Sequence, residues 1–141
     1  MPAFQPTAEQ FRALRDDPHT GPIAQVNILK FKPRAEYKPD DPEYGEDISG
    51  AEAYRRYAEG FAPAAAEVGG QCLLMGKVQR YFIGDGDYDM VMVMHFPSRT
   101  AFIKTLNHPS YETIKRHRDA GLLCQELIST EVLLASGLDG T

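Results

Sequence analysis

The segment Met90–Phe96 carries apolar side chains on both faces of a predicted strand. Successive side chains of a strand point to opposite faces, so the methionines share one face, while Val91, Val93 and His95 share the other. An antiparallel sheet with one face open to water alternates apolar and polar residues instead. The segment 122–134 also has leucine or isoleucine on both faces. Both segments therefore predict a sheet that is covered on each side.

The other apolar segments complete a pattern of strands and helices. Runs rich in β-branched residues and bounded by turn-forming residues predict strands over 22–32, 71–82, 89–96 and 122–134. Capping serines and apolar residues at helical spacing predict one helix over 50–68 and another over 99–120, with a break at 107–108. A shorter helix is expected after Thr7, which forms a capping box with Gln10.

These elements follow the order β-α-β-β-α-β, preceded by the short helix. The order is typical of the ferredoxin-like α+β fold, an antiparallel sheet with both helices on one face. The 141 residues are expected to form a single domain. Its core spans about 21–135, with an N-terminal helical extension over 1–20 and a flexible tail over 136–141.

The second apolar face of the sheet needs a cover that the helices do not supply. The sheet of a second copy is the simplest cover, and face-to-face pairing of two such sheets produces a dimeric α+β barrel. We therefore expect a homodimer through the open sheet face, with the methionine stripe (Met90, Met92 and Met94) lining the barrel. A methionine-lined ligand surface is the alternative.

Charge and hydropathy exclude several classes of partner. Fifteen basic residues against twenty acidic ones give a net charge of -5, whereas a nucleic-acid-binding protein needs a basic surface. The same charge disfavours binding to an anionic membrane. No apolar run approaches the roughly 18 residues of a membrane span. We expect neither nucleic acid nor membrane as a partner.

The cysteines and the N-terminus indicate a reducing compartment. Cys72 and Cys124 stand in separate apolar stretches, which predicts two free, buried thiols. The first residues lack the basic and apolar regions of a secretory signal. A cytoplasmic location is expected.

The segment 33–49 is polar and unusually long for a loop in a compact domain. It holds six of the twenty acidic residues and three prolines. Loops of this length are often lids or binding loops, so we predict a partly mobile flap.

Five polar residues on otherwise apolar elements are candidate ligand-binding residues. Asn27 lies inside a strand, where a buried amide must find hydrogen-bond partners. Tyr54 and Tyr57 place hydroxyl groups on an apolar helix face. Tyr111 and Arg118 share one face of the later helix, and an arginine there needs an anionic partner, a structural salt bridge or a water-filled pocket. We expect the five to converge between sheet and helices.

Two histidines are candidate catalytic bases, since imidazole titrates near neutral pH. His95 ends the third strand, and His108 stands at the helix break. The histidines are not spaced as metal ligands, and the chain has no phosphate-binding or dinucleotide-binding glycine motif. We therefore expect no metal and no cofactor.

Several segments, in this order and spacing, resemble an uncharacterised family, domain of unknown function 1330. The resemblance runs from about 21 to 134 and rests on Val26–Phe31, Ser49–Tyr57, Gly69–Gly70, Phe96–Ser98, Pro109–Tyr111 and Arg118. It implies a dimeric α+β barrel of the ferredoxin-like type. The family has no established activity.

Two functions are compatible with these residues. The first is a cofactor-independent enzyme, monooxygenase-like or isomerase-like, acting on a small aromatic or carbonyl compound. His95 or His108 would then remove a proton, while Asn27, Tyr111 and Arg118 stabilise the oxyanion. The second is a non-catalytic small-molecule-binding or stress-associated dimer. A purely structural dimer is a third possibility.

Overall fold

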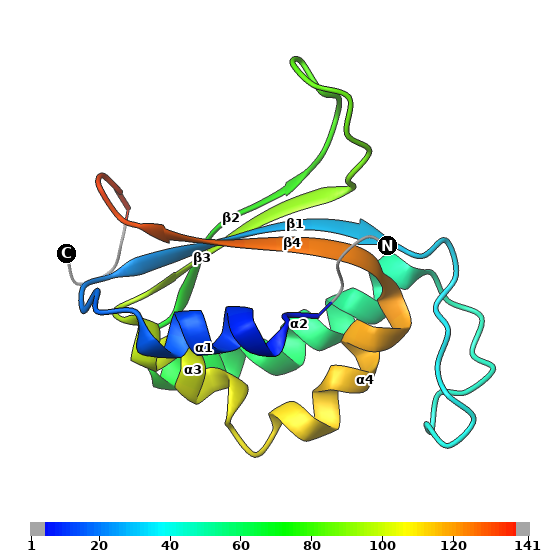
Figure 1. Ribbon diagram of the computed structural model, residues 1–141. Helices are drawn as coiled ribbons and strands as arrows, with labels where there is room; N and C mark the ends of the chain where they lie inside the picture. Colours follow the sequence, from blue (N-terminus) through cyan, green and yellow to red (C-terminus); the bar gives the residue numbers. More distant parts are fainter. Residues whose placement is uncertain (1–4, 138–141) are drawn as a thin grey trace.

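The computed structural model describes residues 5–137, and its element order confirms the predicted ferredoxin-like α+β fold (Figure 1). The elements are α1 Ala8–Asp16, β1 Ile23–Phe31, α2 Gly50–Glu67, β2 Gln71–Lys77, β3 Met90–Phe96, α3 Arg99–Leu106, α4 Tyr111–Gly121 and β4 Leu122–Glu131. The predicted break at 107–108 separates α3 from α4. Within residues 5–137, no helix is long and apolar enough to cross a membrane. Most of the predicted tail, 138–141, lies outside the described residues.

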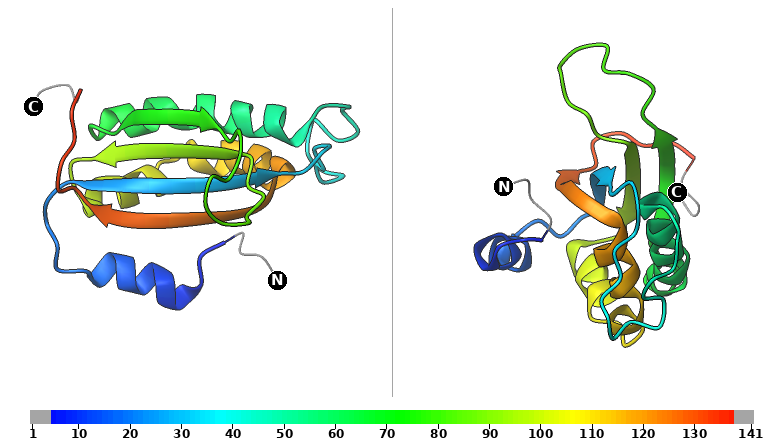
Figure 2. Two further views of the ribbon diagram at one scale, coloured as in Figure 1. Left: turned by 90° about the horizontal axis from the view of Figure 1, so that it is seen from above. Right: turned by 90° about the vertical axis from the view of Figure 1, so that its right-hand side faces the viewer.

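The four strands form one antiparallel sheet in the order β2-β3-β1-β4. Helices α2, α3 and α4 lie below one face, and no helix of residues 5–137 covers the other face (Figure 1). Helix α1 runs beside the edge strand β4 (Figure 2). It begins with the predicted capping box, in which the Gln10 backbone N–H donates to Thr7 Oγ1 at 3.0 Å.

Alternate residues of β1 face the helices and form the core. Ile23 packs with Phe96 and Phe102, while Leu29 packs with buried residues of α2 and β3. The burial pattern of β1 follows the same alternation from Ile23 to Leu29, as expected for a strand with one face under helices.

The methionine stripe lies on the helix-covered face, so its predicted position in the barrel lining is wrong. Met92 is buried against Leu29 and the α2 tyrosines, and Met90 and Met94 pack against the same cluster. The register explains this placement, because β3 pairs Met92 with Asn27, which also faces the helices. A period of two groups the methionines together but does not say which face they occupy.

The opposite side of the sheet, called the open face below, has an apolar centre, with His95, Thr130 and Glu126 on the same face. Residues paired across the strands share a face, and this one carries mainly Ala24, Val26, Ile28, Leu74, Val91, Val93 and Ile128. Leu74 is 53% exposed and Ile128 is 48% exposed. An apolar sheet surface of this kind is typical of an interface.

Two strands end earlier than predicted. β2 stops at Lys77 rather than at 82, and β4 stops at Glu131 rather than at 134. Residues 78–89 form an arm that rises on the side of the open face (Figure 1). The arm is closed at its base where the Val78 N–H donates to the Asp89 carbonyl at 2.9 Å. Its Phe82 is 92% exposed.

The two cysteines differ in exposure. Cys124 is buried, as predicted, but Cys72 is exposed, so that prediction is wrong. Cys72 stands on β2, which forms one edge of the sheet and pairs with β3.

The loop 33–49, predicted as a partly mobile flap, packs against the protein. Ala35 and Tyr37 are buried. The Glu36 N–H donates to the Ala120 carbonyl at 3.0 Å, and the Tyr37 hydroxyl is hydrogen-bonded to Nδ1 of His117 at 2.7 Å. The loop is therefore anchored to the C-terminal half of α4.

Ion pairs hold two acidic side chains of this loop against the helices. Both oxygens of Glu43 accept hydrogen bonds from Arg116 at 2.8 Å, and Glu46 is paired with Arg56 in the same two-pronged way. The Arg116 guanidinium lowers the pKa of Glu43 to about 2, although partial burial acts in the opposite direction. These two carboxylates thus help to dock the loop.

Replacing Gly121 with alanine should destabilise the fold strongly. A Cβ atom at Gly121 would lie far inside contact distance of the Gly50 carbonyl, where α2 begins against the end of α4. Backbone cannot yield as a side chain can, so urea unfolding should show a loss of about 2 kcal/mol or more. Gly76→Ala is the control, since a Cβ there meets nothing within 4 Å. Similar stabilities for the two variants would contradict this account.

Replacing Glu43 with glutamine should reduce stability in a pH-dependent way. The pKa of Glu43 is depressed in the folded state. Its contribution to the free energy of unfolding is therefore complete above pH 4.5 and is lost as the pH falls toward about 2. The variant should be less stable by about 1–3 kcal/mol at neutral pH, and the difference should shrink below pH 4.5. Urea unfolding across pH tests this, with the exposed Glu36→Gln as control. A difference independent of pH would refute it.

Candidate functional site

A cavity of about 910 Å³ lies between the helix-covered face of the sheet and the helices. Its volume falls within the range of about 300–1,000 Å³ that small-molecule sites occupy. The sheet forms its floor, α2, α3 and α4 form its walls, and Phe11 and Leu14 of α1 line one side. The structure brings all five sequence-predicted ligand residues to this sheet–helix cavity: Asn27, Tyr54, Tyr57, Tyr111 and Arg118.

A chain of three polar side chains crosses the floor of the cavity. Arg118 Nη2 donates to Oε1 of Gln125 at 2.7 Å, and Gln125 Nε2 donates to Oδ1 of Asn27 at 2.7 Å. Asn27 Nδ2 donates in turn to the Gln25 and Met92 carbonyls at 3.2 and 3.3 Å. Because the guanidinium can only donate, it sets the orientation of both amides.

Gln125 is a site residue that the sequence reasoning missed. The register places it beside Leu29 on the helix-covered face, next to Asn27. In the sequence, its position seven residues after Arg118 is the one local feature that links the two side chains. Only the pairing of β1 with β4 shows that Gln125 also lies next to Asn27.

The Arg118 guanidinium brings positive charge to the cavity wall. Its side chain is only 11% exposed, and the Asp119 carboxylate lies 3.7 Å from Nη1. A guanidinium is weakly hydrated and offers several donors in a plane, so it suits recognition of an acidic oxygen.

The three tyrosines form an aromatic wall. The ring centroids of Tyr54 and Tyr57 are 5.3 Å apart, and those of Tyr57 and Tyr111 are 6.2 Å apart. Burial raises the pKa of Tyr57 well above its ordinary value and does the same to the pKa of Tyr54, against the opposing effect of Arg118. Both hydroxyls therefore stay protonated at neutral pH and act as hydrogen-bond donors rather than as bases.

Gln25 is a second residue that the sequence reasoning missed. It is 1% exposed and lines the cavity, two residues before Asn27 on the same face of β1. Among residues 5–137, neither its Oε1 nor its Nε2 has a hydrogen-bond partner. Period-two alternation from Asn27 is a signal that could have identified it.

The two histidines predicted as bases lie outside the lining of the cavity. His95 pairs with Ala24 and Gln71 on the open face, because alternation in β3 turns it away from the methionines. His108 lies against α2, with Nε2 2.7 Å from a Glu67 oxygen, and its Nδ1 accepts from the Ser110 N–H at 3.1 Å. The structure therefore does not bring either imidazole to the polar chain.

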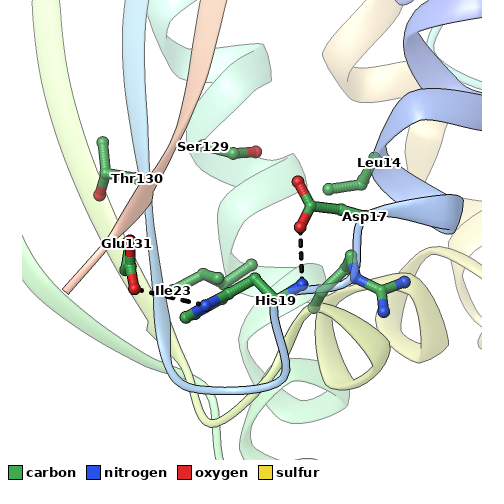
Figure 3. Close-up of a pocket in the computed structure, with 8 residues that line it drawn as sticks. Leu14, Asp17, His19, Ile23, Ser129, Thr130 and Glu131 are labelled. Carbon is green, nitrogen blue, oxygen red and sulfur yellow. Dashed lines mark hydrogen bonds and ion pairs between the residues drawn. The ribbon is translucent and has the colours of Figure 1, made fainter.

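A smaller hollow of about 200 Å³ lies where the end of α1 meets β4 (Figure 3). The Asp17 carboxylate accepts from the His19 backbone N–H at 2.8 Å, and His19 Nδ1 lies 3.5 Å from a Glu131 oxygen. This hollow is smaller than most ligand sites, and its contacts join the α1 end to the sheet. In the described part of the chain, no three His, Cys, Asp or Glu side chains are grouped as metal ligands.

Solved structures resemble this protein over nearly its whole length. The methylated RPA0582 protein is 31% identical, with 97% of this chain and 99% of that chain covered and a TM-score of 0.84. RPA0582 is described as a protein of unknown function from Rhodopseudomonas palustris. A search of curated proteins found no match.

More distant structures share the fold alone. SnoaB, a cofactor-independent oxygenase from Streptomyces nogalater, is 14% identical over 83% of this chain and 98% of that chain, with a TM-score of 0.52. A dimeric ferredoxin-like protein of unknown function from Thermobifida fusca is 12% identical over 81% and 93%, with a TM-score of 0.51.

One protein-family model matches the part of the chain that contains most of the elements around the cavity. It is described as domain of unknown function (DUF1330) and matches residues 45–131, from before α2 to the end of β4. This match and the identity to RPA0582 agree with the resemblance seen in the sequence. The chain belongs to the DUF1330 family.

Proposed function

We propose that this protein binds a small molecule in the sheet–helix cavity, with an acidic oxygen of the ligand against Arg118. The observation that carries the proposal is the Arg118–Gln125–Asn27 chain, a polar strip in the floor of a 910 Å³ cavity. Ligand sites typically combine an apolar lining with a few oriented polar groups.

The lining indicates an aromatic or carbonyl compound. Tyrosine rings and the methionine side chains favour an aromatic body through ring and sulfur contacts. The guanidinium and the protonated tyrosine hydroxyls favour an anionic or strongly polarised oxygen, such as a carboxylate, phenolate or enolate.

Cofactor-independent catalysis is the second candidate. Donors that meet at one oxygen stabilise an oxyanion, and the structural neighbour SnoaB is described as a cofactor-independent oxygenase. The two histidines do not line the cavity, so the substrate would itself have to be acidic enough to lose its proton to solvent when bound beside Arg118. The placement of the histidines favours binding without turnover.

We also propose that two copies pair through the open face. Exposed Leu74 and Ile128 continue an apolar surface formed by β1 and β3. The T. fusca structure is described as dimeric. Pairing the open faces would remove this apolar surface from water.

Replacing Arg118 with methionine should weaken binding of anions selectively. We expect naphthalene-2-carboxylate to bind the wild type and to lose about 10-fold or more in affinity in the variant, because a charge-assisted hydrogen bond is removed. The neutral alcohol naphthalene-2-methanol should be affected much less. Isothermal titration calorimetry measures both affinities.

Arg55→Met is the matched control for this variant, since Arg55 pairs with Glu52 and Glu59 on the exposed side of α2. Equal losses for the anion and the alcohol would contradict the role of Arg118. The same variants separate the two candidate functions on a panel of phenols and lactones. If the wild type turns over one of these compounds and Arg118→Met does not, the protein is an enzyme rather than a non-catalytic binder.

Replacing Ile128 with aspartate should prevent pairing of the open faces. Sedimentation at micromolar concentration should give twice the chain mass of 15.7 kDa for the wild type and the single mass for the variant, because the change buries an unpaired charge. Leu133→Asp, at an exposed position beyond β4, should remain dimeric. A wild type that sediments at the single mass would refute the dimer.

A further inference from the structure

We propose that Gln25 recognises a second group of the same ligand, an uncharged group that presents a hydrogen-bond donor beside an acceptor, as a carboxamide or lactam does. The inference rests on the proposed binding function and extends it to the far end of the cavity. It concerns a residue that the Arg118–Gln125–Asn27 chain does not include.

The side chain of Gln25 has no partner among the described residues although it is almost completely buried. It is 1% exposed, and both its Oε1 and its Nε2 lack a hydrogen bond there. Each unmade hydrogen bond of a buried polar group costs about 1–3 kcal/mol.

The direction of the side chain identifies what can satisfy it. Gln25 lines the sheet–helix cavity, and its cross-strand neighbours on that face are Met94 and Ser129. A second copy bound at the open face cannot reach it, because the sheet lies between. A ligand inside the cavity lies on the same side of the sheet as this side chain.

The chemistry of Gln25 selects a neutral group with both hydrogen-bonding functions. A primary amide offers one acceptor and two donors, and a carboxamide or lactam can bond to both of its atoms at once. The guanidinium in the cavity lining belongs to Arg118, whose head group contacts Gln125 rather than Gln25. An anionic group is therefore favoured near Arg118 and a neutral one near Gln25.

The sheet geometry sets the distance between the two ends. Gln125 lies opposite Leu29, four residues along β1 from Gln25, which corresponds to about 13 Å at the usual rise of a strand. On the same face of the sheet, Asn27 and its cross-strand neighbour Met92 lie between them, and Tyr57 also lines the cavity. The ligand class is thus an elongated, largely apolar molecule with an acidic oxygen at one end and an amide-like group at the other.

Three biphenyl probes test the assignment. The first carries a carboxylate at one para position and a carboxamide at the other, the second carries only the carboxylate, and the third carries only the carboxamide. We expect the wild type to bind the first about 10-fold or more tightly than the second, as measured by isothermal titration calorimetry. In Gln25→Met, which keeps the length of the side chain, this preference should disappear while affinity for the second probe is retained.

The outcomes separate this inference from the proposed function. Equal binding of the first two probes to the wild type, or an amide preference that survives in Gln25→Met, overturns the role of Gln25 and leaves the cavity as a binding site. Absence of binding by all three probes overturns both. Retained affinity of Gln25→Met for the carboxylate probe shows that the variant is folded, and Arg118→Met should lose that affinity while keeping the third probe.

Discussion

The register of β1 against β3 and β4 determines what this protein can bind. Asn27 lies between Met92 and Leu127, and Leu29 lies opposite Gln125. A slip of one residue would turn every side chain of β1 to the other face. Asn27 and Gln25 would then leave the cavity, and the aliphatic side chains of the open face would enter it. Recognition in the cavity and pairing of two copies therefore depend on the same set of backbone hydrogen bonds.

The helices complete the cavity by packing closely in some places and leaving space in others. Gly50 and Gly121 allow α2 and α4 to meet backbone to backbone, and Gly60 accommodates Ile114. Away from these contacts, tyrosine rings from α2 and α4 face the strands across the cavity. The docked loop 33–49 binds the end of α4 through Arg116 and His117, and this anchors the helix that carries Arg118.

The fold and part of the site follow from local sequence patterns. Capping boxes, turn residues and periodicity predict the element order, and polar residues on apolar elements identify the five that line the cavity. The remaining features depend on pairing between distant segments. Alternation groups Met90, Met92 and Met94 but does not say which face helices cover. Gln25 and Gln125 become recognisable only when β1 is aligned with β4. The chemistry of imidazole makes His95 and His108 candidate bases, but alternation in β3 and the geometry of the helix break place both outside the cavity lining.

The central claim is that the ligand lies between the sheet and the helices, against the polar chain. Nuclear magnetic resonance of the labelled protein titrated with naphthalene-2-carboxylate tests it most directly. The account predicts saturable shifts of the side-chain amide resonances of Asn27 and Gln125, with the methyl resonances of Val91 and Val93 on the open face unchanged. Shifts of those methyl resonances with unchanged side-chain amides would contradict it.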